Sequence, residues 1–205
     1  DVFERYSKSV GHAISPRSLP GMKNGQFLAT GAEHGAFGKV TENAANRVYM
    51  MDRRMNKLRH VKTEAIRYFG SENAEVVVVA FGTTLGAAKE AQAQIEAATG
   101  KKCGVIQVRL IFPVPVEQIK AAAGGAKLLV VESNAQAQFA FMLKAAGYNP
   151  AEISSLLKYD GNLITVEEIK DAAVSALNGE QFLVTGGAEG VRPTQDPTIT
   201  LAKEA

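Results

Sequence analysis

Few residues in this sequence have the types and spacing that catalysis requires. The chain has no Gly-x-Ser-x-Gly motif, and no pair of histidines or cysteines stands at the spacing of metal ligands. The only cysteine, Cys103, lies in an apolar stretch, so we expect neither a disulfide nor a cysteine-ligated metal in this chain. The sequence therefore predicts no metal site, and it assigns no catalytic residue.

Three residues near the N-terminus are candidates for contact with a substrate or with another domain. Arg17 could bind a carboxylate through two guanidinium nitrogens, and Glu33 with His34 could form a pair that handles a proton. The alternative is that these residues belong to a linker and fix its turns, and the sequence alone favours this alternative.

A glycine-containing turn supplies a second set of candidates. Residues 81–86 follow the β-branched run of residues 75–80 and precede a helical stretch, an arrangement that aims backbone N–H groups at one point. Gly82, Thr83 and Thr84 are therefore candidates for binding a phosphate. The turn lacks the third glycine of a dinucleotide motif and the lysine of a phosphate loop, so a purely structural turn is favoured.

Alternating strands and helices must position these residues. Continuous apolar runs predict buried strands, and Ala-, Glu- and Lys-rich stretches between them predict helices. The result is an α/β fold, Rossmann-like and doubly wound, with a mainly parallel sheet and right-handed crossovers. The predicted strands cover residues 75–80, 103–110, 127–132 and 153–158, and the predicted helices cover residues 87–98, 116–123, 135–146 and 165–177.

An extended arm and one long helix precede this fold. Residues 1–39 contain two prolines and six glycines, which predicts extended chain and turns, with one short strand at residues 26–30. A helix is expected from residue 43 to about Arg67. Its apolar stripe and its basic faces recur at helical spacing. The stripe consists of Val48, Met51, Met55, Leu58 and Ala65.

These patterns divide the chain into a linker arm (1–44), an α/β domain with its leading helix (45–178) and a C-terminal tail (179–205). Within the tail, residues 182–185 could form an edge strand. The chain begins with Asp1 rather than Met, which suggests a processed product or a fragment.

Charge is distributed unevenly over a composition typical of soluble globular proteins. The net charge is only +2, but residues 1–70 hold 12 of the 23 Lys and Arg residues and 6 of the 21 Asp and Glu residues. The basic helix lacks interleaved aromatic residues, so an acidic partner subunit or solvent is favoured over nucleic acid. No apolar run reaches the roughly 18 residues of a membrane span. The single thiol fits a reducing compartment, and we expect the cytoplasm.

Several motifs, in the same order, resemble the alpha subunits of 2-oxoacid:ferredoxin oxidoreductases, most closely those of the two-subunit 2-oxoglutarate type. The resemblance covers roughly residues 10–178. Gly35-Ala36 departs from it, because an acidic pair commonly stands there. The motifs are Gly11-His-Ala-Ile-Ser-Pro-Arg-Ser-Leu-Pro-Gly21, Ala29-Thr-Gly-Ala-Glu-His-Gly-Ala-Phe-Gly-Lys-Val-Thr-Glu-Asn43, Met51-Asp-Arg-Arg-Met-Asn-Lys-Leu58, Phe81-Gly-Thr-Thr-Leu-Gly86, Gln107-Val-Arg-Leu-Ile-Phe-Pro-Val-Pro115, Val131-Glu-Ser-Asn134 and Lys158-Tyr-Asp-Gly161.

The resemblance implies an enzyme that decarboxylates a 2-oxoacid on thiamine diphosphate, forms acyl-coenzyme A and CO2, and reduces ferredoxin. Thiamine diphosphate, Mg²⁺ and a [4Fe–4S] cluster would belong to the assembled enzyme, a dimer of alpha–beta units. In that family the diphosphate site and the cluster cysteines lie on the beta subunit. This chain would be the alpha subunit's linker and transketolase-C-terminal-like second domain, a structural and subunit-contact module that is inactive alone.

Two other readings remain open. The chain could be a free-standing protein that binds a phosphate or a nucleotide at residues 82–86. It could also be the C-terminal domain of another transketolase-like thiamine enzyme.

Overall fold

The computed structural model describes residues 3–8 and 14–185, and the chain forms two compact units, Asp1–Lys62 and Thr63–Ala205. The boundary falls after the long helix, whereas the sequence pattern grouped that helix with the α/β domain. We describe each unit by itself. The tail expected from residue 179 lies outside the described residues from 186 onward.

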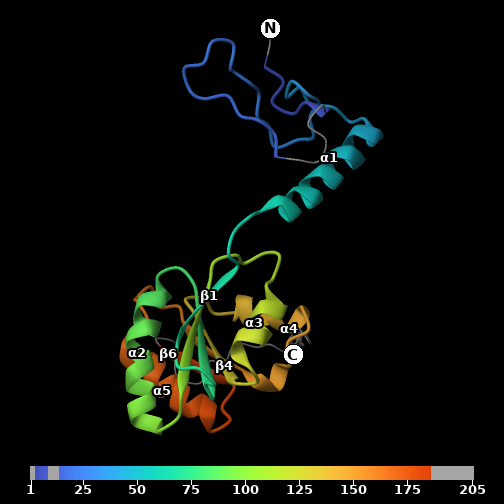
Figure 1. The fold of residues 1–205 in the computed structure, drawn as a ribbon. Helices are drawn as coiled ribbons and strands as arrows, with labels where there is room; N and C mark the ends of the chain where they lie inside the picture. The colour runs from blue at the N-terminus through green and yellow to red at the C-terminus, as the bar shows by residue number, and fades with distance from the viewer. Residues whose placement is uncertain (1–2, 9–13, 186–205) are drawn as a thin grey trace, which may run out of the picture. The chain divides into compact units, whose positions relative to one another are not determined.

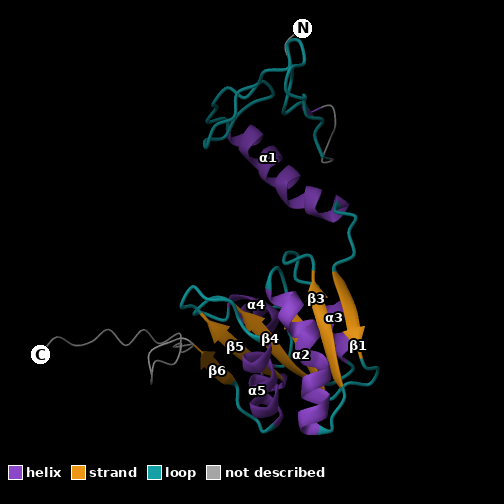
Figure 2. Cartoon of the chain, turned by 90° about the vertical axis from the view of Figure 1, so that its left-hand side faces the viewer, coloured by secondary structure: helices purple, strands orange, loops and turns teal. Residues whose placement is uncertain are grey.

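The second unit is built on a six-stranded sheet with the order β1-β3-β2-β4-β5-β6 (Figure 2). All neighbouring strands are parallel except β1, which pairs antiparallel with β3. This confirms the predicted mainly parallel α/β sheet, and it confirms the edge strand at residues 182–185. The strands are β1 (Ile66–Gly70), β2 (Val76–Ala80), β3 (Cys103–Val108), β4 (Lys127–Glu132), β5 (Ile153–Lys158) and β6 (Phe182–Thr185).

Helices cover both faces of this sheet, as a doubly wound fold requires (Figure 1). Alternate side chains of β2 explain the two layers: Val76 and Val78 pack under α2 (Thr84–Thr99) and α5 (Val166–Leu177). Val77 and Val79 point the other way and contact the layer of α3 (Val116–Ala123) and α4 (Gln138–Ala145). Because every position of β2 is buried between the layers, a continuous β-branched run rather than an alternating pattern encodes this strand.

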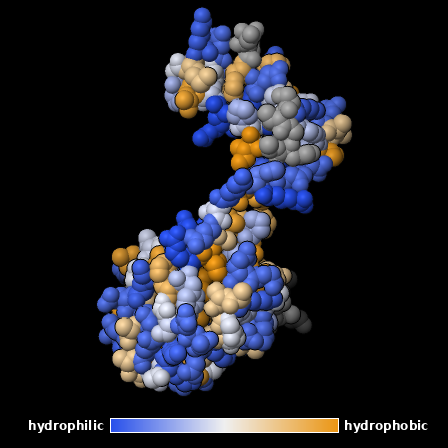
Figure 3. All heavy atoms as spheres, viewed as in Figure 1, coloured by the Kyte–Doolittle hydropathy of each residue, from blue (hydrophilic) through white to orange (hydrophobic). Residues whose placement is uncertain are grey.

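The helix ends follow local capping chemistry. The predicted capping box is confirmed, since Thr165 and Glu168 exchange side-chain and backbone hydrogen bonds at the start of α5. Gly100 ends α2 and Gly124 ends α3, both in the left-handed conformation. Polar and charged side chains cover much of the visible face of this unit (Figure 3).

The first unit contains the arm, α1 (Ala44–Lys57) and a 3-10 turn, Leu58–His60. The prediction of a helix to Arg67 was wrong, because residues 66–70 form β1, whose apolar side chains pair with β3. The predicted strand at residues 26–30 was also wrong, since that segment has no regular structure.

The apolar stripe expected on this helix does not pack within its unit. Val48, Met51 and Met55 are exposed, whereas Met50 and Arg53 are buried against the arm. None of the helices in the described residues is long and apolar enough to cross a membrane.

Candidate functional site

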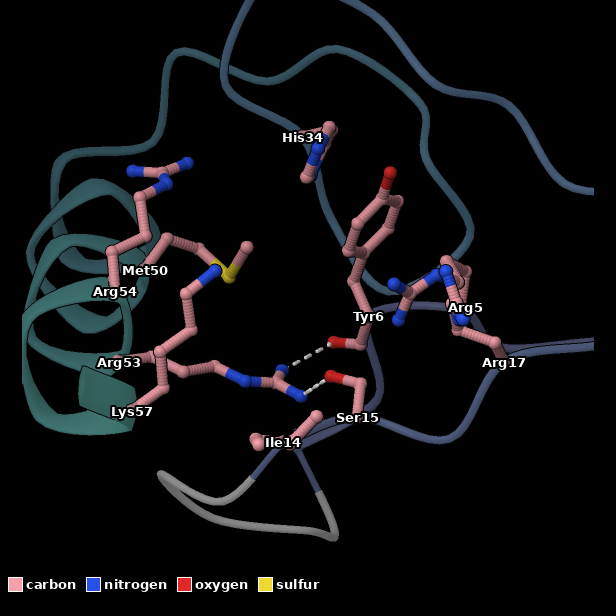
Figure 4. A pocket seen from close by; sticks show the side chains of 10 residues that line it. All are labelled: Arg5, Tyr6, Ile14, Ser15, Arg17, His34, Met50, Arg53, Arg54 and Lys57. Carbon is pink, nitrogen blue, oxygen red and sulfur yellow. Dashed lines mark hydrogen bonds between the residues drawn. The ribbon is translucent and has the colours of Figure 1, made fainter. Parts of the chain in front are cut away.

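The candidate site is a cavity of about 430 Å³ between α1 and the arm, entirely within the first unit (Figure 4). Its volume falls in the range of small-molecule sites, roughly 300–1,000 Å³. The walls come from three segments that are distant in sequence. The lining residues are Arg5, Tyr6, Ile14, Ser15, Arg17, His34, Met50, Arg53, Arg54 and Lys57.

Helix α1 supplies one wall of the cavity. Asn43 caps its N-terminus by accepting a hydrogen bond from the backbone N–H of Asn46 at 2.9 Å. The Asn46 side chain in turn donates to the carbonyl oxygen of His34 at 3.1 Å, which fixes the arm against the helix. The lining residues of α1 lie at positions 50, 53, 54 and 57, and this spacing places them on one helix face.

Arg53 connects that wall to the N-terminal segment. Its Nη1 donates to the carbonyl oxygens of Tyr6 at 3.2 Å and Ser7 at 3.0 Å, and its Nη2 donates to the hydroxyl of Ser15. The residue is only 5% exposed. All of these acceptors are neutral oxygens, so no carboxylate among residues 3–8 and 14–185 pairs with the buried guanidinium.

The opposite side of the cavity carries an aromatic pair. The rings of Tyr6 and His34 stack with their centroids 3.8 Å apart and an interplanar angle of 23°. His34 is 7% exposed, and its Nδ1 is a buried atom with no hydrogen-bond partner among the described residues. Such an atom is costly unless something else binds it.

Glu33 lies outside the cavity lining and holds two arginines of α1 by ion pairs. Arg54 Nη2 lies 2.7 Å from Glu33 Oε1 and 2.9 Å from Oε2, and Arg47 Nη1 lies 3.2 Å from Oε2. The hydrogen bond from Arg54 lowers the pKa of Glu33, and this effect outweighs the desolvation that raises it. The carboxylate therefore pairs with the two arginines, and a proton-handling role with His34 stays a prediction.

The lining residues are strongly basic. Five of them are Arg or Lys, and none is Asp or Glu. Arg5 donates to the carbonyl oxygen of Pro16 at 3.2 Å and lies over the rings of Tyr6 and Phe27. Among the described residues, no hydrogen bond or ion pair engages the side chains of Arg17 and Lys57. Apart from Arg54, which pairs with Glu33, the cations of the cavity thus have no carboxylate partner in the part of the chain that the structure describes.

The structure brings two of the three candidates in the arm to one cavity, and the third lies outside its lining. Arg17 and His34 line the same cavity, and Glu33 reaches it only through Arg54. Sequence reasoning missed Tyr6 and Arg53, which face each other across 47 positions. The basic residues at 53, 54 and 57 recur at helical spacing and predict a solvated or partner-facing surface, whereas in the structure they line the cavity.

The turn after β2 is organised by its own side chain. The Thr84 hydroxyl donates to the Phe81 carbonyl oxygen at 2.9 Å and accepts from the Phe81 N–H at 3.2 Å. Thr84 is buried, and Gly82 has φ +59°, a conformation that favours glycine. These features explain Gly82 and Thr84 without a ligand, and a phosphate at this turn stays a prediction.

The chain is similar to known proteins over most of its length. Residues 74–169 match the family described as pyruvate:ferredoxin oxidoreductase core domain II. The alpha subunit of 2-oxoacid:ferredoxin oxidoreductase 1 from Sulfurisphaera tokodaii is 26% identical over 195 residues, which is 91% of this chain and 30% of that protein. The alpha subunit of 2-oxoacid:ferredoxin oxidoreductase 2 from Aeropyrum pernix is 30% identical over 189 residues, 89% of this chain and 29% of that protein.

A solved structure of an oxidoreductase of this kind also resembles the chain. It is the 2-oxoglutarate:ferredoxin oxidoreductase from Magnetococcus marinus with 2-oxoglutarate, coenzyme A and succinyl-CoA bound, with a TM-score of 0.66 and 28% identity. The match covers 85% of this chain and 31% of that chain, so this chain spans about 30% of the length of such relatives. Residues 74–169 therefore carry a pyruvate:ferredoxin oxidoreductase core domain II, and the chain is similar over most of its length to the alpha subunits of 2-oxoacid:ferredoxin oxidoreductases.

Proposed function

We propose that this chain is part of the alpha subunit of a thiamine-diphosphate-dependent oxidoreductase that converts 2-oxoglutarate and coenzyme A to an acyl-coenzyme A and CO2 and reduces ferredoxin. The observation that carries the proposal is the match, over 85% of this chain, to an enzyme with 2-oxoglutarate, coenzyme A and succinyl-CoA bound. The similarity to 2-oxoacid:ferredoxin oxidoreductase alpha subunits supports the reaction class, and the ligands of the Magnetococcus marinus enzyme support the choice of 2-oxoglutarate.

The residues of this chain do not fit the redox cofactor of such an enzyme. A [4Fe–4S] cluster is held by four thiolates, whereas this chain has a single cysteine. Burial raises the pKa of Cys103 to about 12, so its thiol stays protonated at neutral pH. In the part of the chain that the structure describes, no three His, Cys, Asp or Glu side chains gather as a metal site requires.

We therefore assign no step of the reaction to this chain. In our proposal a beta subunit supplies the cluster cysteines and the site for Mg²⁺ and the diphosphate, and the enzyme assembles as a dimer of alpha–beta units. Val48, Met51 and Met55 support a contact role, because they form an exposed apolar stripe on α1. Such stripes mark surfaces that pack against other protein.

The test is purification of the native complex through a tag on this polypeptide. We expect a beta subunit to copurify, and we expect the complex to reduce methyl viologen only with both 2-oxoglutarate and coenzyme A present. Replacing 2-oxoglutarate by pyruvate tests the substrate assignment separately. The 205-residue chain alone serves as the control and should be inactive. Oxidation of 2-oxoglutarate by that chain unaided would overturn the proposal.

A further inference from the structure

We propose that the cavity between α1 and the arm is a binding site for a small molecule bearing an oxyanion, a carboxylate or a phosphate. The proposal goes beyond the function given above, because it rests on the geometry of residues 5–57 and not on the reaction of the assembled enzyme. Three independent features carry it: charge, unpartnered donors and shape.

The first feature is the buried charge of Arg53. A guanidinium that is removed from water is costly unless it is paired. Within the described residues, Arg53 uses three of its five N–H donors and reaches only neutral oxygens, as Figure 4 shows for Tyr6 and Ser15. An anion in the adjacent cavity would supply the missing countercharge. The folding of the arm over α1 thus prepares a positive site before any ligand arrives.

The second feature is the set of groups that line the cavity without protein partners. Arg17 comes from the arm and Lys57 from the last turn of α1, so the two cations reach the cavity from different walls (Figure 4). The ring of His34, stacked on Tyr6, lines the same cavity. Planar guanidinium groups bind carboxylates and phosphates through two parallel hydrogen bonds. These groups together suit a ligand with at least two anionic oxygens.

The third feature is shape. A volume of about 430 Å³ exceeds what one acidic side chain of a partner protein would fill, and it accommodates a free dicarboxylate or a phosphate-bearing group. The stacked rings of Tyr6 and His34 give the site one flat wall. The observations therefore favour a small molecule over an acidic segment of another subunit.

Calorimetric titration of the 205-residue chain at constant ionic strength tests the site. The probes are inorganic phosphate, 2-oxoglutarate and coenzyme A, with sodium chloride as the blank. Binding of 2-oxoglutarate without phosphate would support a carboxylate site, and coenzyme A binding tighter than phosphate would support a nucleotide phosphate. Either result supports an oxyanion site.

Matched variants show whether binding occurs in this cavity. Arg17→Gln and Lys57→Gln each remove one charge from the lining and should weaken binding of the preferred anion by about ten-fold, the effect of losing one charge-assisted hydrogen bond. Arg59→Gln removes the same charge from an exposed position outside the lining and should leave the affinity within about two-fold. In ¹⁵N spectra the imidazole signal of His34 should shift on binding, whereas that of the exposed His60 should not.

Several results would overturn the proposal. One is no heat or spectral change with any of the three anions beyond the chloride blank. Another is an equal loss of affinity in Arg59→Gln, which would indicate nonspecific attraction to a basic surface. A third is binding by the isolated chain that disappears in the purified complex, which would show that a carboxylate of another subunit fills the cavity. All three are separate from the activity assay, so this inference can fail while the proposed enzyme function stands.

Discussion

Glu132 ends β4 with a fully buried carboxylate, at the edge of the sheet where α/β proteins usually bind ligands. It accepts hydrogen bonds from Asn134 Nδ2 at 2.8 Å, the Phe139 N–H at 2.9 Å and the Ala140 N–H at 3.0 Å. The last two N–H groups lie in the first turn of α4, where no helical carbonyl is available to accept their hydrogen bonds. The N-cap residue, Ala137, has no side-chain oxygen that could accept them instead. Glu132 therefore performs a capping role at a position that invites a catalytic interpretation.

We predict that Glu132→Ala destabilises the α/β unit by about 2 kcal/mol or more, because each buried donor left unsatisfied costs roughly 1–3 kcal/mol. Urea unfolding followed by far-UV circular dichroism measures the change. Glu117→Ala is the matched control. The Glu117 side chain is 78% exposed at the start of α3, so its loss should change the free energy of unfolding by less than about 0.5 kcal/mol. Equal effects of the two substitutions would contradict the capping role.

Cys103 supplies a second prediction for a single residue. The residue is fully buried in β3, and desolvation, together with the nearby charge of Glu96, raises the pKa of its thiol to about 12. Since only the thiolate is nucleophilic, we expect dithionitrobenzoate at pH 8 to label the native chain at least about a hundred-fold more slowly than the chain unfolded in urea. Absorbance at 412 nm follows the reaction. Rapid stoichiometric labelling of native protein would refute the burial of this residue.

At the scale of helices and strands, the sequence predicted most accurately those elements whose formation depends on neighbouring residues alone. The β-branched run of β2 and the Thr165–Glu168 capping box need only neighbouring residues, and both were predicted correctly. β1 was missed because Ala65 continues the helical spacing of the stripe, while the pairing of residues 66–70 with β3 is set by tertiary contact. A Cβ on Gly104 of β3 would lie 2.6 Å from Tyr68 Cζ, so this glycine permits the strand pairing that local propensity did not reveal.

The candidate site shows the same limit. Arg17, Glu33 and His34 were identified from residue type alone, but the sequence could not place Arg17 and His34 on one cavity. The site depends on the contact of Tyr6 and Ser15 with Arg53 on α1, more than 35 positions away along the chain. Helical spacing could have placed residues 50, 53, 54 and 57 on one face, but it does not say which loop covers them.

The junction of β5 with α5 predicts a pH dependence. Lys158 Nζ lies 2.8 Å from Glu168 Oε1 and 3.1 Å from Oε2, and the Thr165 N–H donates to Oε2 at 2.8 Å. Burial raises the pKa of Glu168, but the hydrogen bonds from Lys158 and Thr165 lower it further, so the net value lies below the ordinary 4.5. The folded state then binds fewer protons at this site than the unfolded state does.

The stabilisation by this carboxylate is therefore fully present above pH 4.5 and is lost as the pH falls through the lowered folded-state pKa. We predict that Glu168→Gln is less stable than wild type at pH 7 and that the difference shrinks below pH 4.5. Urea unfolding at pH 7, 5, 4 and 3 measures it. Glu167→Gln, in the same helical turn but exposed, is the control. A difference in free energy of unfolding that stays constant from pH 7 to 3 would contradict the ion pair's role.

At the scale of the whole chain, the two units differ in how they are stabilised. The α/β unit has an apolar core on each face of its sheet, with Val78 and Leu129 in one core and Val79 and Val130 in the other. The N-terminal unit relies on polar contacts, above all those of Arg53 and Arg54 with the arm. Because hydrogen bonds contribute less net free energy than burial of a large apolar core, we expect the N-terminal unit to open first.

Limited proteolysis tests this order of stability. Arg59 and Lys62 are exposed beside the boundary between the units. Arg59 lies in the short 3-10 turn, and Lys62 lies in the segment without helix or strand that follows His60. We predict that trypsin removes the N-terminal unit and leaves a resistant fragment beginning at His60 or Thr63 that keeps the circular dichroism of a folded α/β domain. Mass spectrometry identifies the fragment. In the double variant Arg59→Gln/Lys62→Gln the fragment should begin elsewhere, and early cleavage between residues 66 and 177 would show that the α/β unit does not fold independently.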